Sequence, residues 1–275
     1  MAYLIVVSII WAFSFGLIGR YLQGVDAAVV SAARLGLALL VFAPLLRLGK
    51  LPWRTGLALA GIGGLQFGVM YLLYIQSFQY LQPHEAALFT ITTPIFVTLF
   101  ADAMDRRLRW VALTAALLAV LGTLPVARGA KDLSLTLTGV VLVQLSNAAF
   151  GIGQVLYRRI RSRIELRDRD VFGLMYAGGF VVALSLLVTR DVSLALTATQ
   201  GWTLLYLGVL ASGVGFFLWN VGATKVAAGT LAVMNNAKVP LGVAVSLLFF
   251  GGNADLSRLL TSLVVLGAAV WLAQR

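Results

Sequence analysis

The stretch from Ala232 to Val243, AVMNNAKVPLGV, places two asparagines and a lysine inside a run that is otherwise apolar from Ala227 to Phe250. Lys238 lies about eleven residues into this run, which is about 16 Å at the helical rise of about 1.5 Å per residue. An ammonium group at that depth in a bilayer costs about 2.5–3.5 kcal/mol on insertion scales. The stretch therefore indicates a membrane helix whose polar atoms face protein or a water-filled cavity.

The composition of the whole chain supports a membrane setting. Of its 275 residues, 60% are hydrophobic and only 11% are charged, whereas a soluble domain carries about 25% charged residues. The apolar residues form runs of about 20, the length that crosses a hydrocarbon core about 30 Å thick. We therefore predict an all-α membrane protein, and the N-terminal run Ala2–Gly19 is interpreted as a first span and not as a cleaved signal.

Hydropathy predicts ten membrane-spanning helices joined by short connections. They cover Ala2–Leu22, Ala27–Leu46, Thr55–Gln76, Ala86–Ala103, Trp110–Ala127, Gly139–Tyr157, Val171–Val188, Gly201–Trp219, Ala227–Phe250 and Leu259–Ala273. The longest polar connection, RRIRSRIELRDRD over residues 158–170, is the predicted cytoplasmic linker between the sixth and seventh helices.

The basic residues of the connections predict the orientation of the chain. If the N-terminus is cytoplasmic, 14 of the 21 lysines and arginines fall on the inner side, 5 on the outer side and 2 within spans. This asymmetry follows the positive-inside rule and predicts that both termini are cytoplasmic in a bacterial inner membrane. The net charge of +11 therefore reports orientation, and no nucleic acid is expected as a partner.

Similar sequences recur in the two halves of the chain. FGLIG at 15–19 is echoed by FGIGQ at 150–154, and Pro94 in the fourth span is matched by Pro240 in the ninth. Each half contains five predicted spans, so the second half enters the membrane with the opposite polarity. The pattern predicts two inverted-topology five-helix repeats, residues 1–127 and 128–275, around a central cavity.

At this point the chain resembles a known family. The tryptophan of IIWAFSFG (9–16) in the first span and the sequence HEAALFTITTPIFVTLF (84–100) in the fourth are similar to the EamA-type transporters of the drug/metabolite superfamily. The resemblance covers essentially the whole chain, and within the superfamily it is greatest to YddG-type exporters of aromatic amino acids. It implies a cavity lined by the first, third, fourth, sixth, eighth and ninth spans.

Polar and aromatic side chains within the spans are the candidate substrate-binding residues, because lipid offers them no hydrogen bonds. They are Trp11, Ser14, Tyr71, Tyr74, Gln144, Asn147, Asn235 and Lys238. A structural role stays open for Lys238, which would then bond neighbouring carbonyls, and for Tyr74, which would belong to the interfacial aromatic belt. Arg34 lies about 10 Å from the outer end of its span and is expected to extend towards the outer surface, with a role in transport as the alternative.

Three residues are candidates for gating or for kinking a helix. Pro94 and Pro240 interrupt the backbone hydrogen bonds of the fourth and ninth spans. His84, between Pro83 and Glu85, opens the fourth span. The Pro and the acidic residue suit a helix N-terminus, and a gating or proton-linked role for the only histidine is the alternative.

The expected function is transport of a small organic metabolite by alternating access. No acidic residue falls at mid-depth in a predicted span, which favours a facilitator or an exchanger over a proton-driven carrier. A positive cavity with aromatic walls favours a substrate with a carboxylate and a large apolar part, so export of aromatic or other large apolar amino acids is expected. Drugs, sugar phosphates and nucleotide sugars stay open as alternatives.

Other functional classes find less support in the sequence. The short connections provide no ring of carbonyls or charges typical of a channel filter. An enzyme is not expected, because the chain has no HExxH, no GxSxG and no mid-span carboxylate pair. The predicted partners are a small-molecule substrate and membrane lipid, with no metal, no cofactor and no obligate protein partner.

Overall fold

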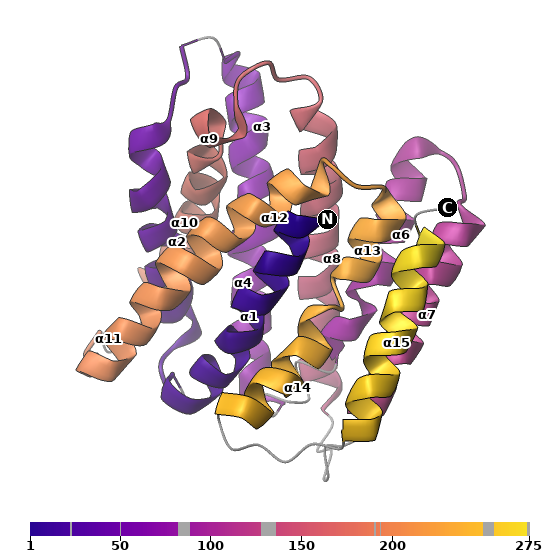
Figure 1. Cartoon of the computed structure of the whole chain (residues 1–275). Coiled ribbons are helices and arrows are strands. Elements are labelled where there is room, and N and C mark those ends of the chain that lie inside the picture. Colours follow the sequence, from indigo (N-terminus) through magenta and orange to yellow (C-terminus); the bar gives the residue numbers. More distant parts are fainter. Residues whose placement is uncertain are drawn as a thin grey trace.

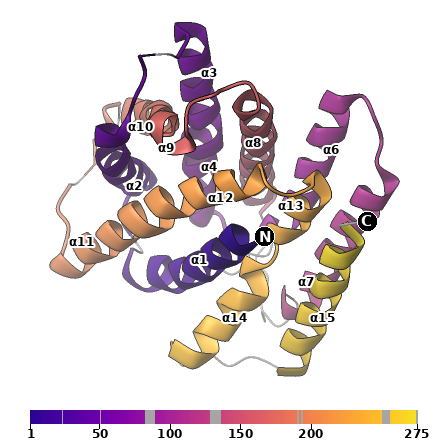
Figure 2. The ribbon, with the colours of Figure 1, turned by 45° about the horizontal axis from the view of Figure 1, so that its top comes forward.

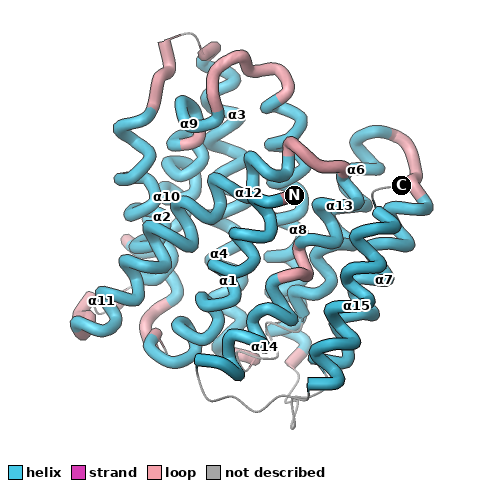
Figure 3. The backbone as a smooth tube through the Cα atoms, viewed as in Figure 1, coloured by secondary structure: helices cyan, strands magenta, loops and turns pink. Residues whose placement is uncertain are grey.

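A computed structural model describes residues 1–22, 24–49, 51–81, 89–127, 136–189, 191–192, 194–249 and 256–273. Within these ranges every regular element is a helix, so the prediction of an all-helical protein is confirmed (Figure 3). Five helical stretches are long and apolar enough to cross a bilayer: Ala27–Leu45, Trp53–Gln76, Leu137–Arg161, Asp168–Leu187 and Ala198–Ala223. Shorter apolar helices cover Ala2–Ile18, Trp110–Gly122 and Leu263–Ala273. The total of ten spans stays a prediction.

The helices follow the predicted apolar runs closely. The first half of the chain forms α1 (Ala2–Tyr21), α2 (Ala27–Phe42), α3 (Trp53–Gly63), α4 (Met70–Gln76), α6 (Thr93–Asp105) and α7 (Trp110–Ala127). The second half forms α8 (Leu137–Arg161), α9 (Asp168–Val171), α10 (Gly173–Leu187), α11 (Ala198–Leu205), α12 (Gly215–Ala223), α13 (Ala228–Met234), α14 (Lys238–Phe249) and α15 (Leu256–Ala273). Short 3₁₀ turns cover Ala43–Leu45, Ser77–Gln79 and Thr90–Thr92.

Helix interruptions fall at matching places in the two halves. A π-helical segment, Gly64–Val69, joins α3 to α4, and another, Tyr206–Val214, joins α11 to α12. The 3₁₀ turn Thr90–Thr92 precedes α6, and a turn over 235–237 separates α13 from α14. π-Helical segments are rare and concentrate at functional sites. All four interruptions lie beside the central cavity described below.

Most of the helix packing joins the first half of the chain to the second. α7 packs against α15 at one side of the molecule, α10 packs against α2 and α3, and α1 packs against α12 and α14 (Figures 1 and 2). Glycines permit the α3–α10 contact: a Cβ on Gly178 would lie 1.8 Å from the Ala60 carbonyl oxygen. A side chain there would separate the helices, so the core is shared between the halves.

The start of α1 and the end of α15 lie towards the same end of the molecule as the connections α2–α3, α6–α7, α8–α9 and α12–α13 (Figure 1). These connections carry basic residues, among them Arg47, Arg106, Arg163 and Lys225, and we call this the basic end. It also carries an ion-pair network between α6 and α8. Arg109 Nη1 lies 2.7 Å from Asp102 Oδ1 and its Nη2 contacts Asp105, whose Oδ1 lies 2.8 Å from Arg159 Nη2. The carboxylates here therefore neutralise arginines of the surface and not charges of the helix interior.

Candidate functional site

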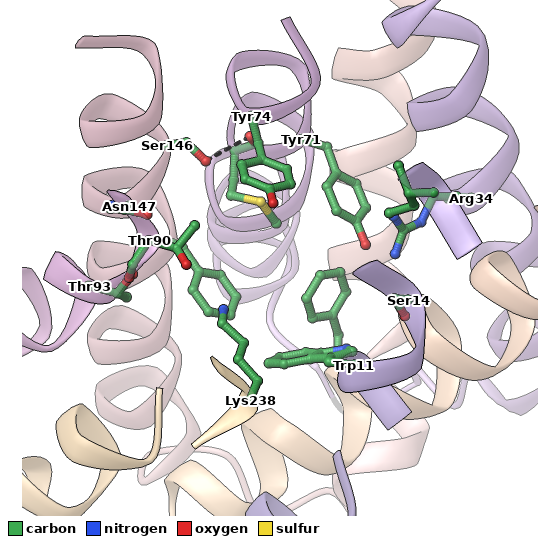
Figure 4. A pocket seen from close by; sticks show the side chains of 14 residues that line it. Trp11, Ser14, Arg34, Tyr71, Tyr74, Thr90, Thr93, Ser146, Asn147 and Lys238 are labelled. Carbon is green, nitrogen blue, oxygen red and sulfur yellow. Dashed lines mark hydrogen bonds between the residues drawn. The ribbon is translucent and has the colours of Figure 1, made fainter. Parts of the chain in front are cut away.

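A cavity of about 100 Å³ opens among helices of both halves (Figure 4). Its walls come from α1, α2, α4, α6 with the turn before it, α8, α12 and α14. The lining residues are Trp11, Ser14, Ile18, Arg34, Met70, Tyr71, Tyr74, Thr90, Thr93, Ser146, Asn147, Phe150, Phe216 and Lys238. Concave sites with apolar walls and a few polar groups are typical small-molecule sites.

Lys238 is the first residue of α14 and extends into the cavity (Figure 4). Its Nζ lies 5.4 Å from the centre of the Trp11 ring and 5.8 Å from that of Phe150. These cation–π contacts stabilise an ammonium group by about 0.5–2 kcal/mol. Nζ donates no hydrogen bond to a described residue and has no carboxylate partner among them. Its charge is therefore available to a ligand.

Arg34 also lines the cavity, with only 4% of its surface exposed. Its Nε donates a hydrogen bond of 3.0 Å to Ser212 Oγ, and its Cζ lies 4.4 Å from the centre of the Tyr71 ring. The Tyr71 hydroxyl lies 3.0 Å from the same Ser212 Oγ. The expectation that Arg34 extends to the outer surface is wrong, because the π-helical segment Tyr206–Val214 supplies a buried hydroxyl that holds it inside.

Aromatic rings form the apolar wall between these two cations. The Trp11 ring centre lies 4.8 Å from that of Trp219 and 5.4 Å from that of Phe216, and Phe216 stacks on Phe67 at 4.5 Å. Trp11 Nε1 donates to the carbonyl of Ala211 at 2.8 Å, which fixes the indole. Sequence reasoning did not identify Phe216, since an apolar ring in an apolar span gives no signal of its own.

The amides of α8 have two different positions. Asn147 lines the cavity, where its Nδ2 donates to the Phe89 carbonyl at 2.8 Å and to Thr92 Oγ1 at 3.1 Å. Gln144, one turn away, is not among the lining residues, and its Oε1 accepts a hydrogen bond from Thr92 at 2.8 Å. Both amides therefore tether the 3₁₀ turn before α6, where the helical hydrogen bonds are irregular.

Asn235 lies one turn away from the cavity, in a buried layer of amides. Its Nδ2 and Gln154 Oε1 lie 3.3 Å apart, and Gln154 Oε1 also accepts from Trp219 Nε1 at 2.9 Å. Gln66 donates to Asn220 Oδ1 at 3.2 Å in the same region. Gln154 on α8 and Gln66 before α4 both lie closer to the basic end than the cavity-lining residues of the same helices. The amide layer therefore closes the cavity on that side.

The remaining predicted residues divide between the cavity and its supports. Ser14 and Tyr74 line the cavity, and Ser14 Oγ donates to the Ile10 carbonyl at 3.3 Å. Pro94 is the second residue of α6 and Pro240 the third of α14, each just after a helix interruption. His84 lies outside the described residues.

The comparisons with known proteins decide the family. The sequence profile of the EamA-like transporter family matches residues 1–128 and 137–274. The chain belongs to the EamA-like transporter family. It is therefore an integral membrane protein of the transporter class, as its composition predicts.

Individual EamA-like relatives match along the whole chain. The "Biotin transporter" of Escherichia coli (strain K12) is 40% identical, over 100% of this chain and 93% of the relative. That of Salmonella typhimurium (strain LT2) is 41% identical with the same coverage. The "Probable biotin transporter" of Pseudomonas aeruginosa PAO1 is 43% identical, over 98% and 96%.

A solved structure titled only "Crystal structure of protein" shares the fold, with a TM-score of 0.77 at 19% identity over 98% of this chain and 94% of that chain. The resemblance to exporters of aromatic amino acids is corrected by these findings, because the full-length relatives are named for biotin. An amino acid was expected from the charge and the aromatic residues of the predicted cavity.

Proposed function

We propose that this chain transports biotin across a bacterial inner membrane by alternating access. One observation carries the proposal: Arg34 and Lys238 face the same aromatic cavity, and neither has a carboxylate partner among the described residues. Leaving charged groups unpaired in a low-dielectric interior is costly. Such a cost is expected where a ligand brings the opposite charge.

Biotin suits this cavity in three respects. It carries a carboxylate at the end of an aliphatic chain, which a cation would bind. Its fused ring system is compact and apolar at its faces, as are the walls formed by Trp11, Phe150 and Phe216. It also carries a ureido group, which needs polar partners at the far end. The names of the full-length relatives support the same substrate.

The transport path is proposed to lie between two inverted halves, residues 1–127 and 128–275. Several features support this division. The π-helical segments Gly64–Val69 and Tyr206–Val214 occupy the third predicted span of each half, and the interruptions before Pro94 and Pro240 occupy the fourth. Helix pairs also exchange between halves: α1 packs on α14 as α8 packs on α6, and α2 packs on Tyr206–Val214 as α10 packs on Gly64–Val69.

The amide layer is proposed to be the inner seal that opens during transport, with both termini on the cytoplasmic side. Its hydrogen bonds join α8, α12 and the turn after α13, which come from separate parts of the chain. Gln66 Oε1 in this layer, and Oδ1 of the adjacent Asn236, are buried and have no hydrogen-bond partner among the described residues. A seal that is not fully bonded costs less to break than a saturated one, because water restores those bonds on opening.

Uptake of labelled biotin into proteoliposomes tests the proposal. Purified protein should give saturable uptake that excess unlabelled biotin competes away, and protein-free liposomes should give none. Phenylalanine and a sugar phosphate serve as competitors of other classes and should leave biotin uptake unchanged. Uptake equal to that of empty liposomes, with transport of one of the other compounds, would replace biotin as the substrate.

A further inference from the structure

The two cations of the cavity are held in different ways. Arg34 is fixed by the hydrogen bond from its Nε to Ser212 and by its position over the Tyr71 ring. Its terminal nitrogens, Nη1 and Nη2, have no hydrogen-bond partner among the described residues, although Arg34 is only 4% exposed. The two terminal nitrogens of the guanidinium are therefore free to donate hydrogen bonds to a ligand.

A guanidinium edge and an ammonium group recognise different partners. The two terminal nitrogens of arginine lie in one plane and match the two oxygens of a carboxylate. Lysine presents a compact charge on a flexible stem and suits a single acceptor oxygen. Among the described residues, the Lys238 ammonium interacts only with the faces of Trp11 and Phe150, so its Nζ can move to meet such an oxygen.

The positions of the two residues set them at opposite ends of one ligand. Figure 4 shows Arg34 and Lys238 reaching the cavity from opposite sides, with the rings of Tyr71 and Trp11 between them. A ligand bound against these rings would therefore meet the guanidinium at one end and the ammonium group at the other.

We infer that Arg34 binds the carboxylate of the substrate through Nη1 and Nη2, and that Lys238 binds the ureido carbonyl oxygen at the opposite end. This inference rests on the proposed function. It makes Arg34 the residue that selects acids over neutral analogues, and Lys238 the residue that selects a carbonyl acceptor. Ser212 becomes a positioning residue, because it orients the guanidinium without contacting the ligand.

The test compares three probes in competition with labelled biotin uptake. Biotin has both groups, biotinamide replaces the carboxylate by a neutral amide, and 2-iminobiotin replaces the ureido oxygen by a group that donates hydrogen bonds. Wild-type protein should prefer biotin to each analogue by about tenfold or more, since a hydrogen bond to a charged group contributes on that scale. Arg34→Gln should lose the preference over biotinamide and keep that over 2-iminobiotin.

Lys238→Gln should show the opposite pattern, and Arg20→Gln, which removes an arginine outside the cavity, should show neither change. Arg34→Lys, which keeps the charge without the fork, should weaken the preference for the acid without abolishing it. If Arg34→Gln does not fold, Ser212→Ala provides the measurement and should reduce the same preference. Acid selection that survives in the Arg34 and Ser212 variants, or that disappears with Lys238→Gln, would overturn the assignment.

The outcome is separable from that of the proposed function. If wild-type protein takes up no biotin, the same variants are compared by thermal stabilisation with acid and amide pairs, lipoate against lipoamide and phenylalanine against its amide. Stabilisation by acids over amides that depends on Arg34 would keep the assignment of the carboxylate site while biotin fails. Selection independent of Arg34 would refute it.

Discussion

Replacing Lys238 by methionine separates the cost of burying its charge from the use of that charge in transport. A lysine at the centre of a membrane helix costs about 2.5–3.5 kcal/mol, and its contacts with the Trp11 and Phe150 rings return about 1 kcal/mol. Methionine keeps the length of the side chain and packs against aromatic rings. Lys238→Met is therefore expected to stabilise the folded protein by about 1–3 kcal/mol while it reduces biotin uptake at least about tenfold.

Thermal unfolding in detergent and uptake in proteoliposomes measure the two effects on the same preparation. Lys225→Met is the matched control, because Lys225 also lies over an aromatic ring, 5.1 Å from the centre of Tyr3, but is exposed at the basic end. The free energy of unfolding of Lys225→Met should differ from that of the wild type by less than about 0.5 kcal/mol, as is usual for surface substitutions. A Lys238→Met protein that is less stable than wild type, or that transports biotin at the wild-type rate, would refute the reasoning.

Further substitutions address the helix contacts and the basic end. Gly153→Ala places a Cβ 2.3 Å from the Gln66 Cβ and should destabilise the protein by about 1–3 kcal/mol; an unchanged melting temperature would contradict the close approach of α8 to the π-helical segment. Pro240→Ala restores a backbone donor beside the turn at 235–237 and should slow uptake without lowering stability; an unchanged rate would remove the interruption from the mechanism. The hydrogen bond from Arg109 lowers the pKa of Asp105, so this carboxylate stabilises the fold above its unfolded pKa of about 4 and loses that effect as the pH falls through the lower folded value. Asp105→Asn should therefore lower the melting temperature slightly at pH 7 and by progressively less as the pH falls below about 4, and a difference that does not shrink on acidification would contradict the ion pair.

The positions of the helices could be predicted from sequence because apolar length alone determines where a membrane helix lies. The interruptions within these helices could not be predicted from sequence. The segment GLQFG at 64–68 reads as close packing, and Gly68 does face α10, where a Cβ would lie 2.9 Å from the Gly179 carbonyl oxygen. This π-helical segment packs against α10, which is more than 100 residues away in sequence. The local sequence pattern therefore predicts the helix, but it does not predict the π-helical segment within it.

The candidate site was predictable in chemistry and less so in geometry. Trp11, Tyr71 and Lys238, which the sequence offers as candidate substrate-binding residues, line one cavity in the structure. The position of Arg34 in its span also predicts that its side chain extends to the outer surface. The sequence alone cannot show that Ser212, 178 residues away, provides a buried acceptor.

Helix-face spacing has a similar limit for the amides. Gln144 and Asn235 have the same spacing and polarity as a cavity residue, but Gln144 accepts a hydrogen bond from Thr92 and Asn235 bonds to Gln154 of α8. Asn147 has such bonds too, yet it lines the cavity. The difference lies in which side of α8 and α13 meets another helix, and that depends on the packing of the two halves.

The substrate-bound structure is the most direct test of the claim that this cavity receives the cargo. A map of the protein determined with saturating biotin should show the ligand against the Trp11 and Phe216 rings, with its carboxylate within hydrogen-bonding distance of Arg34. Biotin bound elsewhere, or a cavity without ligand density under conditions where the same preparation takes up biotin, would contradict the account.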